Sequence, residues 1–193
     1  MKTSSKITLA AAALALLGLA ASSPHGDERK DSDARWKTIV IDVAVDARTA
    51  VLNQVNPTNA LPKRGDTFIE NGKIYPAGTI PSGDGFDIAT TGSIGTSVAR
   101  GTFNFDFSQA FTGGDPLISS TEDYLFSATG ALNGEGSLMS EGQDSIIGST
   151  HRVVLGGTGI YPGTIGEVKK EVLGQNSTGF LNHRFTFTIR SPE

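Results

Sequence analysis

The first regular pattern in the chain is an alternation that begins just after Trp36. From position 39 to position 45 every second residue is Ile or Val, and the positions between them carry Val40, Asp42 and Ala44. A period of two is typical of a β-strand that buries one face. The pattern therefore predicts a half-buried strand at the start of the folded part of the chain.

Further strand-like runs follow, separated by Gly and Pro. The predicted strands cover residues 67–70, 73–75, 87–90, 101–107, 124–132, 136–140, 151–155, 164–173 and 180–190. Asn71-Gly72, between the first two runs, is a dipeptide typical of a tight hairpin. After the N-terminal segment no apolar stripe at helical spacing lasts three turns. We expect an all-β chain of eight to ten short strands, which either closes into a barrel or packs as two sheets.

Residues 156–159, Gly-Gly-Thr-Gly, lie between two of the predicted strands. Adjacent glycines let the backbone adopt positive φ values and approach a neighbour closely, so we expect a tight turn between antiparallel strands. A dinucleotide-binding loop is a poor interpretation. Pro162 stands where that motif needs its third glycine, and no helix is predicted to follow.

The N-terminus has the order of a secretory signal. Lys2 and Lys6 precede an apolar run over residues 7–21, which ends in small residues. A run of about 15 residues is shorter than the ~20 of a spanning helix, which favours a removable signal over a membrane anchor. We expect residues 1–23 to be a signal peptide, residues 24–36 a charged and disordered leader, and residues 37–193 one folded domain. The mature protein is then secreted or periplasmic, with no membrane attachment.

Composition and motifs argue against several classes of protein. There is no cysteine, so stability must come from packing and not from disulfides. A formal charge of −4 argues against a nucleic-acid partner. No Gly-x-Ser-x-Gly elbow is present and the three histidines lack metal-ligand spacing, which disfavours hydrolases and zinc enzymes.

Four segments in the second half of the chain carry a family resemblance. They are Gly142-Gln143-Asp144, residues 151–159 (His-Arg-Val-Val-Leu-Gly-Gly-Thr-Gly), Gly166-Glu167-Val168, and Gly179-Phe180 with Arg184. Together they resemble the plant dirigent proteins and the related allene oxide cyclases, over about residues 39–189. The resemblance implies a closed eight-stranded antiparallel β-barrel, usually trimeric, whose lumen holds a small apolar molecule without any cofactor. Dirigent proteins are secreted and steer the coupling of phenoxy radicals or the closure of quinone methides, whereas the cyclases act on fatty-acid epoxides.

The resemblance also implies three catalytic candidates. Asp42 matches an aspartate proposed to act as acid or base on the first strand of dirigent proteins, and Asp144 matches a second one. The family arginine precedes the glycine segment, where this chain is one residue shorter, so the position has two candidates. Because side chains alternate along a strand, Arg152 shares the required face and His151 does not.

Three aromatic residues are candidates for substrate binding. Phe103 and Phe105 align with family positions that carry tyrosines, although aromatic residues on one strand face more often serve packing. Tyr124 has a hydroxyl that could donate to a ligand oxygen, although half-buried tyrosines usually satisfy a core or rim position.

The sequence allows two interpretations of Asp42. In a barrel lumen, apolar walls would raise the pKa of the carboxyl and make it a usable acid near neutral pH, and a neighbouring arginine would reverse that effect. On the outside of a sheet it would simply be a solvated charge.

Three functional hypotheses follow. The protein is a cofactor-free cyclase or isomerase that folds a reactive apolar substrate into one conformation. Alternatively it is a non-catalytic carrier of a hydrophobic small molecule. The third hypothesis is a structural module whose barrel is filled by side chains.

Overall fold

The computed structural model describes residues 36–57, 61–114, 117–127 and 135–191. The predicted signal peptide, residues 1–23, lies outside the described residues, as does all of the predicted leader except Trp36. Within the described ranges, no helix has the length and apolar character needed to cross a membrane.

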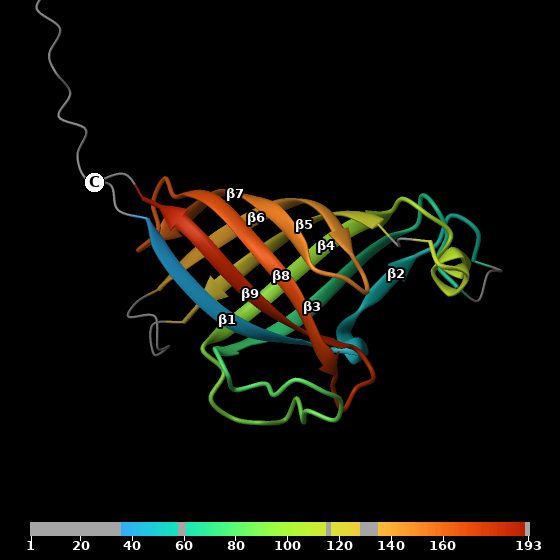
Figure 1. Ribbon diagram of the computed structural model, residues 1–193, viewed down its shortest axis with the longest axis horizontal. Helices are drawn as coiled ribbons and strands as arrows, with labels where there is room; N and C mark the ends of the chain where they lie inside the picture. The colour runs from blue at the N-terminus through green and yellow to red at the C-terminus, as the bar shows by residue number, and fades with distance from the viewer. Residues whose placement is uncertain (1–35, 58–60, 115–116, 128–134, 192–193) are drawn as a thin grey trace, which may run out of the picture. The chain divides into compact units, whose positions relative to one another are not determined.

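Strands make up most of the described part of the chain (Figure 1). They are β1 (Lys37–Val45), β2 (Val51–Asn53), β3 (Thr67–Pro76), β4 (Gly95–Phe103), β5 (Leu117–Phe126), β6 (Gly136–Ser145), β7 (Thr150–Gly159), β8 (Ile165–Gln175) and β9 (Leu181–Arg190). Two short 3₁₀-helices, η1 (Ala47–Thr49) and η2 (Phe107–Thr112), follow β1 and β4.

The sheet closes on itself through β1. Hydrogen-bonded neighbours run in the order β1-β9-β8-β7-β6-β5-β4-β3-β2, and β1 also pairs with β3. In the closing pair, residues 41–45 of β1 lie antiparallel to residues 72–76 of β3. The result is a closed eight-stranded antiparallel barrel, which confirms the predicted fold. β2 is an additional strand on residues 67–69 of β3, and it lies with η2 at one end of the barrel (Figure 1).

Inward-facing side chains fill the barrel toward the opposite end. Tyr124 lies at the centre of this apolar core, with its ring edge-on to Phe185 at 5.2 Å and to Phe187 at 4.9 Å between centroids. Such edge-to-face contacts are the favoured geometry of buried aromatic rings. The core comprises Ile41, Val43, Val45, Ile74, Ile94, Tyr124, Phe126, Leu138, Val154, Tyr161, Val168, Phe185, Phe187 and Ile189.

The predicted hairpin at Asn71-Gly72 does not form, because β3 continues through both residues. Gly72 is needed for close packing instead. A Cβ at this position would lie 2.7 Å from both Ser97 Oγ and Val43 Cγ1, on the two neighbouring strands. The glycine thus marks the place where β3 passes close to β1 and β4, and the dipeptide alone could not distinguish this from a turn.

The glycine segment at residues 156–159 is also part of a strand and not a turn. It forms the second half of β7, and the turn to β8 comes after it, at residues 160–164. The register of β6 against β7 shifts here, because Met139 pairs with Gly156 while Ser140 pairs with Val154. Leu155 is therefore the extra residue of a β-bulge, which bends the strand.

A long segment, residues 77–94, connects β3 to β4 and packs on the outside of the barrel (Figure 1, bottom). Ile80 and Ile88 from this segment form a small apolar core with Ala44 and Tyr75. The strand predicted at residues 87–90 falls here, and those residues form a turn instead.

Asp42 anchors this segment to the barrel. Its carboxylate is fully buried and accepts hydrogen bonds from the backbone amides of Gly78 (2.8 Å) and Ile80 (3.1 Å). It also pairs with Arg184 on β9, whose Nε lies 2.8 Å from Oδ1 and whose Nη2 lies 3.1 Å from Oδ2. Asp42 therefore points away from the barrel interior, toward the covering segment.

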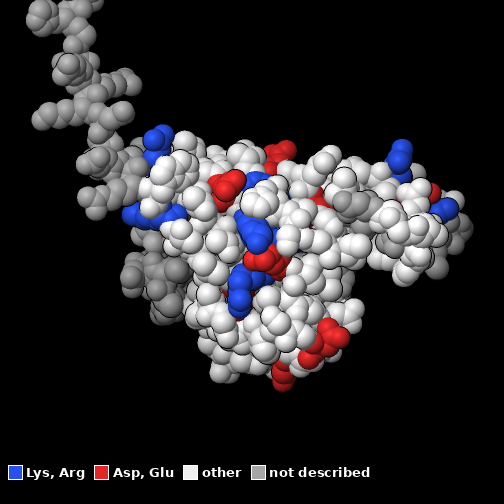
Figure 2. All heavy atoms as spheres, viewed as in Figure 1, with Lys and Arg blue, Asp and Glu red and all other residues white. Residues whose placement is uncertain are grey.

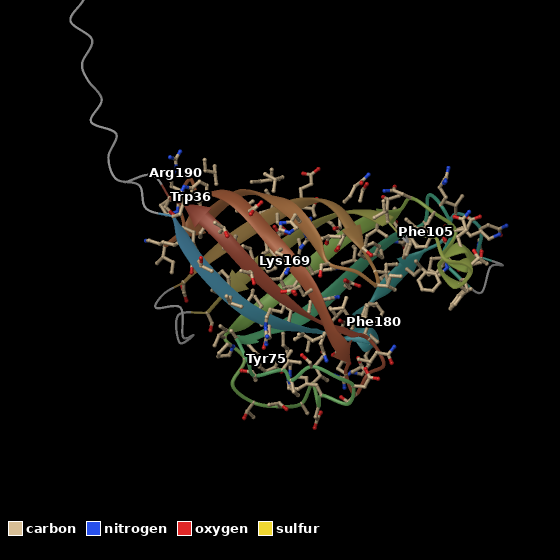
Figure 3. The ribbon with its side chains drawn as sticks, viewed as in Figure 1. Trp36, Tyr75, Phe105, Lys169, Phe180 and Arg190 are labelled. Atoms are coloured by element: carbon tan, nitrogen blue, oxygen red, sulfur yellow. The ribbon has the colours of Figure 1, made fainter. Side chains whose placement is uncertain are left out.

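On the side of the barrel that faces the viewer, charges of both signs adjoin one another (Figure 2). Lys169 and Glu171 pair at 2.9 Å along β8 on this side of the barrel, and Figure 3 labels Lys169 there. This face carries no large patch of a single sign.

Replacing Asp42 with Asn is expected to destabilise the protein by about 2–4 kcal/mol. The change leaves Arg184 unpaired and weakens two hydrogen bonds to backbone amides in a buried place. Denaturant unfolding measures the loss. Asp123→Asn is the matched control, because Asp123 pairs with Arg100 on the outer surface in a more exposed ion pair, where the expected loss is below about 1 kcal/mol. Equal losses in the two variants would contradict the anchoring role.

Gly157→Ala is expected to destabilise the barrel by about 2 kcal/mol or more, because a Cβ there would lie 2.5 Å from the carbonyl oxygen of Ser137 and 2.7 Å from that of Tyr161. At Gly156 a Cβ would meet open space, so Gly156→Ala serves as the control and should change stability by less than about 0.5 kcal/mol. Thermal unfolding of the two variants tests the difference, and similar melting temperatures would refute it.

Candidate functional site

A pocket of about 640 Å³ occupies the end of the barrel next to β2 and η2. Its rim is apolar and partly exposed, as Leu52 and Leu61 illustrate. Aromatic and aliphatic side chains continue the wall inward. The main apolar lining residues are Phe68, Phe103, Phe107, Ile118 and Phe180.

The interior is layered along the strands. On β5, Ile118 lies in the apolar wall, Ser120 and Glu122 come next, and Tyr124 belongs to the filled core. These residues are two apart, so alternation places them all on the inner face. Polar side chains on several other strands lie at the same middle level. This polar layer comprises Glu70, Ser97, Ser120, Glu122, Asp144, Arg152, Lys170 and His183.

Arg152 from β7 organises the polar layer. Its Nη2 donates to Glu122 Oε2 at 2.7 Å and to the Tyr124 hydroxyl at 2.6 Å. Its Nη1 donates to Ser120 Oγ at 3.0 Å and lies 3.7 Å from Asp144 Oδ2. The side chain is fully buried and does not line the pocket, so Arg152 fixes two carboxylates that do.

Asp144 connects the arginine to a second cation. Its Oδ1 lies 2.7 Å from Lys170 Nζ and accepts a hydrogen bond from the Thr150 hydroxyl at 2.7 Å. Glu122, Asp144, Arg152 and Lys170 thus form one chain of ion pairs in which two negative charges balance two positive ones. Pairing of this kind is what allows charges to be buried.

Two polar side chains at the pocket remain without partners in the described part of the chain. Glu70, from β3, keeps some exposed surface in the pocket and makes no hydrogen bond or ion pair there. Neither ring nitrogen of His183 is hydrogen-bonded within the same ranges, and its Nε2 is fully buried.

The surroundings keep both of these groups uncharged at neutral pH. Burial raises the pKa of Glu70 to about 8, and the nearby negative charge of Glu122 adds to the effect. Burial lowers the pKa of His183 well below its usual range, helped by the positive charges of Lys170 and Arg152. The polar layer as a whole is therefore close to neutral, with one protonated carboxyl facing the pocket.

The structure brings together two of the three predicted catalytic residues. Asp144 and Arg152 both belong to the polar layer, and Asp144 lines the pocket. Asp42 lies on the outside of the barrel beneath residues 77–94, as described above, so it does not join them. Of the two candidates for the family arginine position, Arg152 lies inside the barrel, whereas the side chain of His151 is exposed.

The three predicted substrate-binding residues lie in three different places. Phe103 lines the pocket. Phe105 is buried behind it, 6.0 Å away between ring centroids, and does not belong to the pocket lining (Figure 3 shows it beside η2). Tyr124 lies in the core beneath Arg152, and burial raises its pKa well above the usual range. Its hydroxyl contacts Arg152 and Ser140.

Sequence reasoning missed Glu70, Glu122, Lys170 and His183. Glu122 preceded the predicted start of its strand, and Glu70 stood next to the expected hairpin. Lys170 did carry a signal, because it takes an inward position between Val168 and Val172, where an apolar residue would otherwise be expected.

Comparison with known proteins finds this fold elsewhere. No family model matches the chain, and no curated protein sequence matches it significantly. Among solved structures, two dirigent proteins described as pterocarpan synthases each superpose with a TM-score of 0.60 and 13% identity. The match covers 82% of this chain and 86% or 97% of theirs. A pyocyanin demethylase superposes with a TM-score of 0.53 and 14% identity, over 79% of this chain and 99% of its own.

These matches confirm the resemblance at the level of fold. The protein shares the barrel fold of these dirigent proteins. At such low identities the comparison shows shared architecture, and chemistry must be argued from the site.

Within the ranges that the structure describes, no group of three or more His, Cys, Asp or Glu side chains could hold a metal ion.

Glu70→Gln is expected to stabilise the protein at alkaline pH. Glu70 has a folded pKa of about 8 and an ordinary value of 4.5, so the unfolded chain ionises first as pH rises. The free energy of unfolding therefore falls between about pH 4.5 and pH 8, and the Gln variant escapes that fall. We expect a gain of about 1–3 kcal/mol at pH 9 and almost none at pH 4.

Denaturant unfolding at the two pH values measures the Glu70 effect. Glu141→Gln, at an exposed position of β6, is the control and should show no such pH-dependent difference. A gain that is the same at pH 4 and pH 9 would argue against an elevated pKa.

Proposed function

We propose that this protein binds a small apolar molecule in its barrel and guides the cyclisation or stereoselective coupling of that molecule. The observation that carries the proposal is an apolar-walled pocket that ends on a buried, hydrogen-bonded layer of charges. The N-terminal segment supports export as part of the proposal, and the family resemblance supports a homotrimer. No cofactor is invoked.

The pocket suits a ligand with a hydrocarbon body. Its volume of about 640 Å³ falls within the roughly 300–1,000 Å³ of small-molecule sites. The aromatic walls formed by Phe68, Phe103 and Phe107 offer flat apolar surfaces. Burial of about 200 Å² of ligand surface there would contribute roughly 5 kcal/mol to binding. Such walls restrict a flexible chain or ring system to few conformations, which lowers the entropic part of a cyclisation barrier.

The polar layer suits chemistry at one end of that ligand. Asp144 lines the pocket and is fixed by Lys170, Thr150 and Arg152, so its orientation does not have to be established during a reaction. Fixed charges in a water-poor site stabilise charge that develops in a transition state. In this proposal Asp144 handles a proton or a developing positive charge, and Arg152 acts as a positioning residue.

A specific observation favours a carrier as the second candidate. The four charges of the layer are already paired with one another, so the pocket can accept a neutral molecule without any reaction. A purely structural barrel is less well supported, because one end of the barrel is open and not filled by side chains.

Native mass spectrometry of protein purified from the exported fraction of its own host tests the proposal. Ala99 lines the pocket, so Ala99→Phe is expected to fill it and abolish co-purification of an apolar compound. Thr96→Phe, at an exposed position of the same strand, should retain the compound and serves as the control. Retention of the compound by Ala99→Phe would contradict binding in this pocket.

The identified compound then separates catalyst from carrier. Asp144→Asn is expected to reduce turnover at least tenfold with little loss of binding, because the side chain keeps its shape and loses its charge. Product analysis by chiral chromatography measures turnover and stereochemistry. A wild-type protein that binds the compound and leaves it unchanged would establish the carrier.

A further inference from the structure

Among the described residues that line the pocket, Glu70 is the one acidic side chain that is not already bound. Glu122 and Asp144 are held by Arg152 and Lys170, whereas Glu70 has no hydrogen-bond or ion-pair partner among the described residues. It lies in the pocket lining, one inward position deeper than Phe68 on β3. A carboxyl group in such surroundings has strong hydrogen-bonding capacity that the protein leaves unused.

We propose that Glu70 is the anchor for the polar end of the ligand, and that it recognises an uncharged oxygen function by donating a hydrogen bond from its protonated carboxyl group. The inference rests on the proposed function, because it assigns a ligand class to the same pocket. That class is an apolar molecule that carries a carbonyl, ether or similar neutral oxygen at one end.

The charges around Glu70 favour a neutral ligand. The titratable groups that face it are Glu122 on β5, Asp144 on β6, Arg152 on β7, Lys170 on β8 and His183 on β9. The pocket-lining residues of β1, β2 and β4 include no titratable group within the described ranges. The negative charges of Glu122 and Asp144 balance the positive charges of Arg152 and Lys170, and His183 is neutral. A charged ligand would therefore find no unpaired opposite charge in the pocket.

Each kind of charged ligand also meets a specific obstacle. An anion would face the carboxylates of Glu122 and Asp144, and it would compete with them for cations that they already hold. A cation would need Glu70 in its ionised form. With a pKa of about 8, ionising Glu70 at pH 7 reduces the affinity about tenfold. A neutral acceptor has no such cost, because it uses the carboxyl in the form that the pocket already stabilises.

Three naphthalene probes of nearly the same shape test the ligand class. They are 2-acetonaphthone, which has a neutral ketone, 2-naphthoate, which has a carboxylate, and 2-isopropylnaphthalene, which has no oxygen. Ligand-observed NMR measures their binding to the folded protein from pH 6 to pH 9.5. At pH 6.5 we expect the ketone to bind at least tenfold more tightly than either of the others. Its advantage should fall as the pH rises through about 8.

Variants of Glu70 connect this preference to the side chain. Glu70→Gln keeps a hydrogen-bond donor of the same shape, so it should retain the preference for the ketone and lose its pH dependence. Glu70→Leu should bind the ketone and the hydrocarbon equally. Glu141→Gln, on the outer surface of β6, should behave as the wild type.

The outcomes distinguish this inference from the proposed function. If the hydrocarbon or the carboxylate binds as tightly as the ketone, or if ketone binding by the wild type does not change with pH, the role of Glu70 is refuted and an apolar pocket remains. If none of the probes binds the wild type, both the ligand class and the proposed function are overturned.

Discussion

The pairing of β1 with two strands at once is the constraint on which the rest of the structure depends. Without the contacts between residues 41–45 and residues 72–76 the sheet would have two open edges, and its inner face would meet water. Once the sheet is closed, inward side chains share a confined space, and each charged group among them needs a partner of opposite charge there. The ion-pair chain centred on Arg152 satisfies this requirement with residues from four neighbouring strands, β5 to β8.

Closure also explains why the site consists of paired charges and one unpaired acid. Four buried charges destabilise a barrel unless they neutralise each other, and the geometry of Glu122, Arg152, Asp144 and Lys170 achieves this. Burial raises the pKa of Glu70, and the negative charge of Glu122 adds to this effect, which is why Glu70 holds its proton. A network of paired charges therefore lies beside a carboxyl group that is left for contact with a ligand, and this combination distinguishes the pocket from an ordinary hydrophobic cavity.

The sequence predicts the class of fold better than it predicts the site. Alternation was enough to predict an all-β fold, because the period of two survives in most strands. The choice of a closed barrel over two packed sheets came from the family resemblance. The positions of the turns were predicted less well than the strands. Asn71-Gly72 and residues 156–159 lie inside strands, where glycine serves close packing or a bulge, and local sequence does not distinguish these uses from a turn.

The site required information that one strand does not contain. Whether Asp42 lies inside or outside depends on the register of β1 and on residues 77–94, which are distant in sequence and cover it. Glu122 and Lys170 do lie inside the barrel, but the sequence alone did not place them there. Only the closed barrel shows that Glu122 pairs with Arg152 and that Lys170 pairs with Asp144 inside it. Asp144 and Arg152 were found through the resemblance, and their contacts give each a different position relative to the pocket.

The layered interior has a consequence for how such a barrel can diversify. Along a single strand, the residue that shapes the entrance lies only two positions from a residue of the polar layer, as Ile118 and Ser120 illustrate. Changes at Ile118, Phe68 or Phe103 would alter the outline that a ligand must match, and the deeper ion pairs would remain intact. Descendants of one ancestral barrel could therefore acquire new ligands through a few substitutions at the entrance while inheriting an unchanged electrostatic interior.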